Sequence, residues 1–111
     1  LDDTIRRLQA FERAGADALF APGLTRADDI RAVCSSVGKP VNVVMGMKGV
    51  SFSVDELAAL GVRRISLGAS LCRAALAGLF RAAREIREKG TFGFAEDATP
   101  YAEMKSLMAG R

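Results

Sequence analysis

Residues 15–23 read GADALFAPG, a short apolar run that stands between two glycines. Glycine recurs at Gly38 and Gly61, so that the phrases GADALFAPG, GKPVNVVMG and GVRRISLGA follow one another at intervals of 23 residues. A short apolar run between turn residues is typical of a strand buried on both faces, as in a parallel sheet. The repeat therefore predicts three buried strands, and each is followed by a segment with a helical pattern.

The helical segments carry recognisable start signals. Residues 2–14 place apolar side chains on one face at the spacing of a helix. Ser53 with Glu56 three residues later predicts a capping box. Polar residues at four predicted helix starts are interpreted as N-caps: Thr25, Ser53, Ser70 and Thr99. The helix predicted from Ser70 is long and amphipathic, and it ends at Gly90.

The order of elements predicts an α/β fold. Strands that alternate with helices at this spacing form right-handed βαβ units and a parallel sheet. A closed barrel of such units needs eight strands and about 250 residues, whereas this sequence of 111 residues supplies three strands. We therefore expect the C-terminal part of a (β/α)8 TIM-type barrel, with a partial barrel over residues 1–90. Residues 91–111 are predicted to form a C-terminal tail with a helix.

Composition narrows the class of protein. The chain is 50% hydrophobic and 26% charged, with a mean hydropathy of +0.14, which indicates a soluble globular protein. No apolar run reaches the roughly 18 residues that span a bilayer, and no signal peptide is visible. A net charge of +3, one Tyr and no Trp argue against a nucleic-acid partner. Cys34 and Cys72, without any histidine, predict buried thiols in a cytoplasmic protein and argue against a zinc site.

The loops that follow the strands predict an anion site. In a βα repeat these loops meet at one end of the sheet, where helix N-termini present unpaired N–H groups. Four glycines let a ligand approach the backbone there: Gly23, Gly46, Gly49 and Gly68. A carboxylate or a phosphate-like group would suit such an edge. The alternative is that these glycines only make tight turns.

Asn42 is the most informative single residue, because it interrupts the apolar strand PVNVVM. A buried amide needs hydrogen-bond partners, so Asn42 either braces a neighbouring strand or reaches toward a ligand. Lys48 either neutralises an anion or is a solvated loop lysine. The carboxylates fall at helix starts, where they favour the helix dipole. No nucleophile–base pair and no metal cluster is visible, so the catalytic residues are unknown and no metal ligand is predicted.

Three phrases carry a resemblance to a known superfamily: LDDTIRRLQAFERAGADALFAPGL, KPVNVV and LGVRRISLGASLCRAALAGLFRAAREIREKGTF. In this order they resemble the C-terminal part of the isocitrate lyase and phosphoenolpyruvate mutase superfamily. The resemblance implies strands six to eight of the barrel and a Mg²⁺-dependent lyase or mutase. Such enzymes act on C–C or C–P bonds of small carboxylates or phosphonates through enolate-like intermediates. It also implies a homo-oligomer in which the helix after strand eight is exchanged between barrels.

The departures from the superfamily pattern limit what is carried over. The superfamily's magnesium carboxylates and its catalytic Cys loop belong to the first half of the barrel, so Cys34 and Cys72 do not inherit that role. Lyase members have a Glu near the end of strand six, where this sequence has Pro22. The Asn in strand seven makes Asn42 the first candidate for a substrate contact. Three residues at the loops complete the candidate set: Gly46, Gly68 and Ser70.

These expectations lead to one functional prediction with two alternatives. The parent protein is predicted to be a cytoplasmic, Mg²⁺-dependent lyase or phosphonomutase of a small 2-oxo acid or phosphonate. The chain alone is predicted to be inactive. The first alternative is a non-catalytic, anion-binding half-barrel that forms a small oligomer. The second is the phosphate-binding half of an unrelated barrel enzyme.

Overall fold

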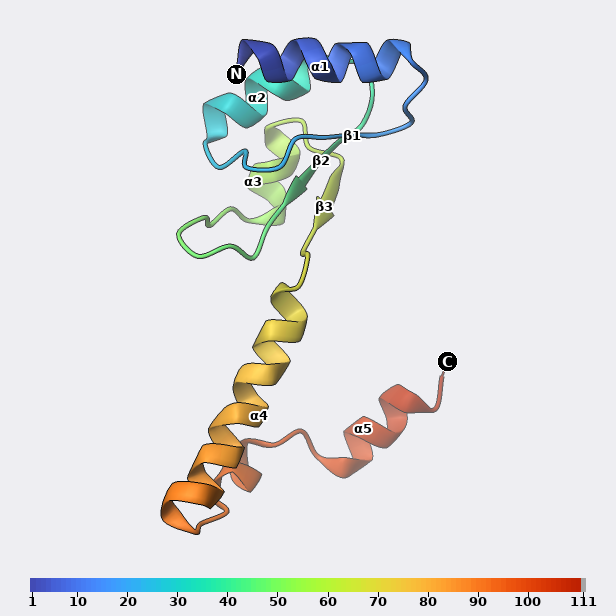
Figure 1. Cartoon of the computed structure of the whole chain (residues 1–111). Helices are drawn as coiled ribbons and strands as arrows, with labels where there is room; N and C mark the ends of the chain where they lie inside the picture. Colours follow the sequence, from blue (N-terminus) through green and yellow to red (C-terminus); the bar gives the residue numbers. More distant parts are fainter. Residues whose placement is uncertain (111) are drawn as a thin grey trace. The chain divides into compact units, whose positions relative to one another are not determined.

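The computed structural model describes residues 1–110 of the chain (Figure 1). By its internal contacts the chain divides into two compact units, Leu1–Leu71 and the residues from Cys72 onward. The boundary falls near the start of the long helix α4 (Ser70–Lys89). The domain division expected at residue 90 stays a prediction. The two units are described separately below.

The first unit is a three-stranded parallel sheet with helices between its strands, in the order β1-β2-β3 (Figure 1). The prediction of three parallel strands in βα units is thus confirmed. The register pairs Leu19 with Val41 and Asn42 with Arg64. The elements of this unit before α4 are α1 (Asp2–Arg13), β1 (Leu19–Phe20), α2 (Ala27–Ser35), β2 (Val41–Val44), α3 (Val54–Ala59) and β3 (Arg64–Ser66).

The core lies on one face of this sheet. Two clusters of buried side chains join the strands to α1, α2 and α3, and they include Leu19, Val41 and Val43 from the strands. Successive side chains of a strand point to opposite faces, so Phe20 lies on the other face, where it is 45% exposed. The prediction of strands buried on both faces is therefore met by β2, where Asn42 is buried on this second face, but not by β1. The helices that pack on this sheet cover one of its faces only.

The capping box of α3 is confirmed. The Ser53 hydroxyl accepts from the Glu56 backbone N–H at 3.1 Å, and the Glu56 carboxylate accepts from the Ser53 backbone N–H at 2.6 Å. The bond from the Ser53 backbone, followed by that from its side chain, lowers the pKa of Glu56 below its ordinary value. The start of α3 and the end of the preceding loop are therefore held by two reciprocal bonds.

The other predicted caps are wrong. Helix α2 begins after Arg26, whose extended backbone makes it the N-cap without a side-chain bond, so Thr25 lies one residue too early. The last helix was predicted to open at Thr99 and Pro100; helix α5 (Tyr101–Met108) has Pro100 as its N-cap, so only Thr99 lies one residue too early. Ser70 is itself the first residue of α4, and its hydroxyl donates to the Leu67 carbonyl at 2.6 Å. Short polar side chains also bond locally in turns, so their presence marks a helix start only to within a residue or two.

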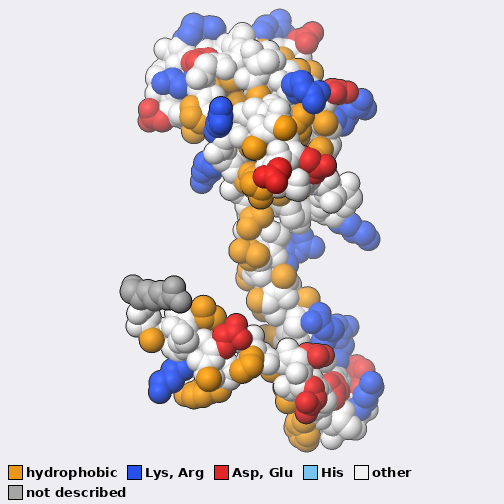
Figure 2. All heavy atoms as spheres, turned by 180° about the vertical axis from the view of Figure 1, so that it is seen from behind, with side chains coloured by type: hydrophobic (Ala, Val, Ile, Leu, Met, Phe, Trp, Pro, Cys, Tyr) orange, Lys and Arg blue, Asp and Glu red, His pale blue; other side chains and the backbone are white. Residues whose placement is uncertain are grey.

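The second unit is helical. It contains most of α4, the 3₁₀ helix η1 (Gly93–Asp97) and α5, and none of these helices buries a residue. The predicted apolar face of α4 is present but exposed (Figure 2). Its large exposed side chains beyond residue 71 are Leu76, Leu79, Phe80 and Ile86. Among the helices of residues 1–110, none combines the length and the apolar character required to cross a membrane.

Glu85 holds the turn that follows α4. One carboxylate oxygen accepts from the Thr91 hydroxyl at 2.7 Å and from the Gly93 backbone N–H at 2.6 Å. The other oxygen accepts from the Phe94 backbone N–H at 3.0 Å. These bonds, with that from Thr91 the largest contributor, lower the pKa of Glu85 below its ordinary value. A single carboxylate thus fixes the start of η1 against the end of α4.

Acidification should release this turn. Because the pKa of Glu85 is lowered in the folded chain, its bonds stabilise the turn fully above the ordinary carboxyl value. That stabilisation is lost as the pH falls through the lowered, folded value. In a ¹H–¹⁵N spectrum the amide signals of Gly93 and Phe94 should shift together in this acidic range. Glu85→Gln should abolish the shift and Glu88→Gln should preserve it; a shift that survives Glu85→Gln would contradict the assignment.

Candidate functional site

The carboxyl edge of the sheet brings three of the four sequence candidates together. Because the strands are parallel, the loops after them leave the sheet at one edge. Gly46 has a φ of +85°, and a Cβ atom added to it would lie 2.6 Å from the Ser70 Cβ and would also clash with the Ser70 hydroxyl oxygen. A Cβ atom added to Gly68 would lie 3.9 Å from the Val44 side chain. Gly46 and Ser70 therefore form a closely packed corner, and Gly68 lies beside the end of β2, two residues before Ser70 in the same loop.

The helix starts that follow the strands differ in their electrostatics. The start of α3 is occupied by the carboxylate of its own capping box. The first turn of α2 carries Asp28 and Asp29, which pair with Arg31 and Arg26. The first turn of α4 contains no acidic residue. Of these three helices, only α4 therefore has an N-terminal positive charge that no carboxylate in its first turn neutralises. This helix begins at Ser70, beside Gly68.

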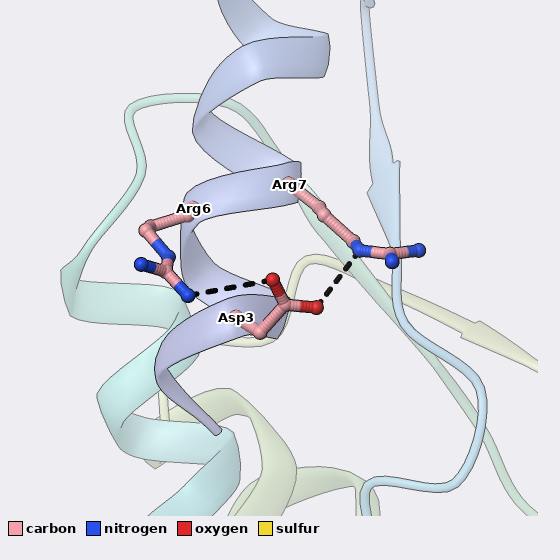
Figure 3. Close-up of polar contacts among 3 residues, drawn as sticks. All are labelled: Asp3, Arg6 and Arg7. Atoms are coloured by element: carbon pink, nitrogen blue, oxygen red, sulfur yellow. Dashed lines mark hydrogen bonds and ion pairs between the residues drawn. The ribbon is translucent and has the colours of Figure 1, made fainter.

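The remaining carboxylates serve the helices. Asp3, in the first turn of α1, pairs with Arg7 at 2.9 Å and with Arg6 at 3.5 Å (Figure 3). Exposed pairs of this kind contribute about 1 kcal/mol or less to stability. Within residues 1–110 no three Cys, Asp or Glu side chains gather where they could hold a metal ion. The described residues do not fit a Mg²⁺ site, and no chemical step through a metal follows from them.

Asn42 lies on β2 and is 2% exposed. Its Nδ2 donates to the Ser66 hydroxyl at 3.1 Å, and its Oδ1 accepts from Nη1 of Arg64 at 3.1 Å. Both ends of the amide therefore bind to β3, which is the bracing role that the sequence left open. A contact between Asn42 and a substrate stays a prediction.

Arg64, the first residue of β3, is a polar neighbour of Asn42 that was not among the site residues predicted from the sequence. The signal that could have identified it is the register. Paired residues of neighbouring strands lie 22 positions apart, as Phe20 and Asn42 or Asn42 and Arg64 do, although the glycines repeat every 23. The glycine repeat aligns Asn42 with Ile65, whose side chain belongs to the opposite face.

The other residues named in the sequence analysis, Lys48, Cys34 and Cys72, lie outside the corner of Gly46 and Ser70. Lys48 is exposed in the loop after β2. Cys34 is half-buried against Gly61, and burial raises the pKa of its thiol. Cys72 is exposed, so the prediction of two buried thiols is wrong for this residue. It lies on α4, a helix that buries none of its residues within the described chain.

The chain is similar to several known proteins. The family model of phosphoenolpyruvate phosphomutase matches residues 1–87. An oxaloacetate decarboxylase from Bradyrhizobium diazoefficiens is 35% identical over 88 residues, which cover 79% of this chain and 30% of the relative. The crystal structure of a "putative lyase/mutase" from Burkholderia cenocepacia J2315 is 55% identical, with a TM-score of 0.90 over 98% of this chain and 39% of that one.

A more distant structure extends the likeness to the superfamily. The crystal structure of 2,3-dimethylmalate lyase, a member of the PEP mutase/isocitrate lyase superfamily, is 26% identical with a TM-score of 0.76. It matches 99% of this chain and 39% of its own length. The chain thus spans less than half the length of each of these proteins. On the match of its first 87 residues, the chain belongs to the phosphoenolpyruvate phosphomutase family, within the PEP mutase/isocitrate lyase superfamily.

Proposed function

We propose that this chain forms strands six to eight, with their helices, of a (β/α)8 lyase or mutase. The enzyme would act on a C–C or C–P bond of a small 2-oxo acid or phosphonate. The parallel sheet with its helices in βα units supports this proposal. So do relatives named as an oxaloacetate decarboxylase and a dimethylmalate lyase.

The observation that carries the proposal is the corner of Gly46 and Ser70, with Gly68 beside it, at the carboxyl edge of the sheet. Gly46 and Gly68 are both exposed, although Ser70 fills the Cβ position of Gly46, and the start of α4 supplies a positive end without an acidic residue in its first turn. A carboxylate or phosphonate group suits this combination. We assign the corner, together with Asn42 on the adjoining strand, to substrate binding.

Catalysis needs groups that the described residues do not supply. We propose Mg²⁺ as the cofactor on the superfamily resemblance, with its ligands on other strands of the barrel, where it would stabilise an enolate-like intermediate. The residues of this chain would bind and orient the acid. The 111-residue chain is therefore expected to be inactive alone.

The exposed apolar face of α4 supports a homo-oligomer. An amphipathic helix is stable when its apolar stripe packs against another surface, and Leu76, Leu79 and Phe80 of this stripe are exposed in the single chain. We propose that a neighbouring subunit covers them by exchange of α4, with the tail over residues 91–111 packed on that subunit. The free thiols of Cys34 and Cys72 suit a cytoplasmic protein.

Turnover measurements test the proposal. The protein that carries this chain with the rest of its barrel should consume oxaloacetate, phosphonopyruvate or methylisocitrate with Mg²⁺, and it should sediment as an oligomer. In the complex the Ser70 hydroxyl would turn from the Leu67 carbonyl to the charged acid, so Ser70→Ala should raise KM about tenfold. Gly49→Ala is the matched loop control, since nothing lies near its Cβ position. Failure to turn over any of the three acids would contradict the function, and turnover by the chain alone would contradict the partial barrel.

A further inference from the structure

Arg64 lies on the face of the sheet that α1, α2 and α3 leave uncovered. It is the register partner of Asn42 on β2, so the two side chains share a face. The next residue, Ile65, packs into the helix-covered core, which places Arg64 and Ser66 on the opposite side. The Arg64 side chain is exposed. A cation thus lies on this sheet face at the start of β3, away from the helices that carry the other charged pairs.

The guanidinium of Arg64 is held in place by a rigid neutral partner. Its Nη1 donates to Oδ1 of Asn42 at 3.1 Å. The amide cannot turn away, because its Nδ2 donates to the Ser66 hydroxyl, which in turn donates to the Val43 carbonyl at 3.4 Å. Asn42 is 2% exposed, so the amide at the centre of this network is buried, while the Arg64 guanidinium reaches the surface. One of the five N–H donors of the guanidinium is used in this bond, and the others stay free to bind.

The charge of Arg64 is not neutralised by the described residues. The ion pairs found within residues 1–110 involve five other arginines: Arg6, Arg7, Arg26, Arg31 and Arg87. The guanidinium is anchored by Asn42, keeps its full charge and has unused N–H donors. It is therefore preorganised to bind a planar anion with two oxygens, such as a carboxylate. We infer that Arg64 binds a carboxylate group on this face of the sheet and that Asn42 is the residue that positions it.

The Arg64 guanidinium lies away from the corner of Gly46 and Ser70, and Asn42 is the one residue that this site shares with the proposed substrate site. Arg64 starts β3, and Gly68 follows four residues later, which is roughly 13 Å along an extended strand. The carboxylate has two sources, a small acid that enters the sheet face or an Asp or Glu side chain from another strand of the barrel. Either source would place a carboxylate against the N–H groups of the Arg64 guanidinium, and the experiment below distinguishes the two sources.

An NMR titration of the purified chain with oxalate tests the inference, with chloride at equal ionic strength as the reference. The Arg64 Nε–H and the Asn42 side-chain amide should shift in a saturable manner. Arg64→Gln should weaken binding about tenfold or more, because a charged two-oxygen contact is lost. Arg63→Gln removes the same charge one residue earlier and should leave binding unchanged. No saturable shift, or an equal loss in both variants, would overturn the inference.

Asn42→Asp gives a second, independent arm. The new carboxylate would sit against Arg64 with little change of shape, and Ser66 could donate to it. Oxalate binding should therefore fall about tenfold although the chain stays folded; undiminished binding would overturn the positioning role. In the complete barrel, a strand carboxylate would leave the Arg64 signals already shifted and insensitive to oxalate, whereas a small-acid site would still titrate. Signals from Gly46 and Ser70 report the proposed substrate corner separately.

Discussion

Replacement of Gly46 by alanine should lower the free energy of unfolding by about 2–5 kcal/mol. Two costs add. A φ of +85° is unfavourable for a residue with a side chain, at roughly 1–2 kcal/mol. The new methyl group would also lie 2.6 Å from the Ser70 Cβ, and such overpacking costs about 1–3 kcal/mol. Urea unfolding followed by circular dichroism measures the sum.

Gly49 offers a matched control in the same loop. Its φ is +82°, yet nothing lies within 4 Å of its Cβ position. Gly49→Ala should therefore show the backbone cost alone, about 1–2 kcal/mol. In the background of Ser70→Gly, the steric part of the Gly46→Ala effect should disappear. Equal losses for Gly46→Ala and Gly49→Ala would show that the corner of Gly46 and Ser70 is not closely packed.

Leu57→Ala should cost about 2–5 kcal/mol, because the substitution leaves a cavity in a fully enclosed position. Leu57 is 1% exposed and packs in the cluster that joins α2, β2 and α3. It anchors the six-residue helix α3, which has no other buried residue. Loss of this anchor should also loosen the loop between β2 and α3, which begins with Gly46 after Met45.

The control for this substitution is the same change on an exposed helix. Leu107 in α5 is 70% exposed in the single chain, so at a concentration where the chain is monomeric Leu107→Ala should change the free energy of unfolding by less than about 0.5 kcal/mol. Both variants are measured by urea unfolding, and hydrogen exchange of the residues from Gly46 to Ser53 reports the loop. If Leu57→Ala were as mild as Leu107→Ala, the first unit would lack the core described above.

Local signals predicted the elements of the fold well. Apolar runs between glycines gave the three strands, and the sequence SVDE gave the capping box of α3. Both depend on neighbours within a few residues, which a sequence displays directly. The exact N-cap residue was predicted less reliably, because several neighbouring residues can each occupy the cap position. Thr25 and Thr99 each precede a residue that serves as the N-cap instead.

The sequence alone determined that three βα units follow one another, that their loops share an edge, and that Asn42 is a polar residue inside a strand. The tertiary structure decided which residues meet. It paired the strands 22 residues apart rather than 23, and so placed Arg64 instead of Ile65 beside Asn42. It also pressed Gly46 against Ser70, which lies 24 positions away. Side chains alternate along a strand, so a shift of one residue exchanges the two faces, and only the packing of the helices against the sheet selects between them.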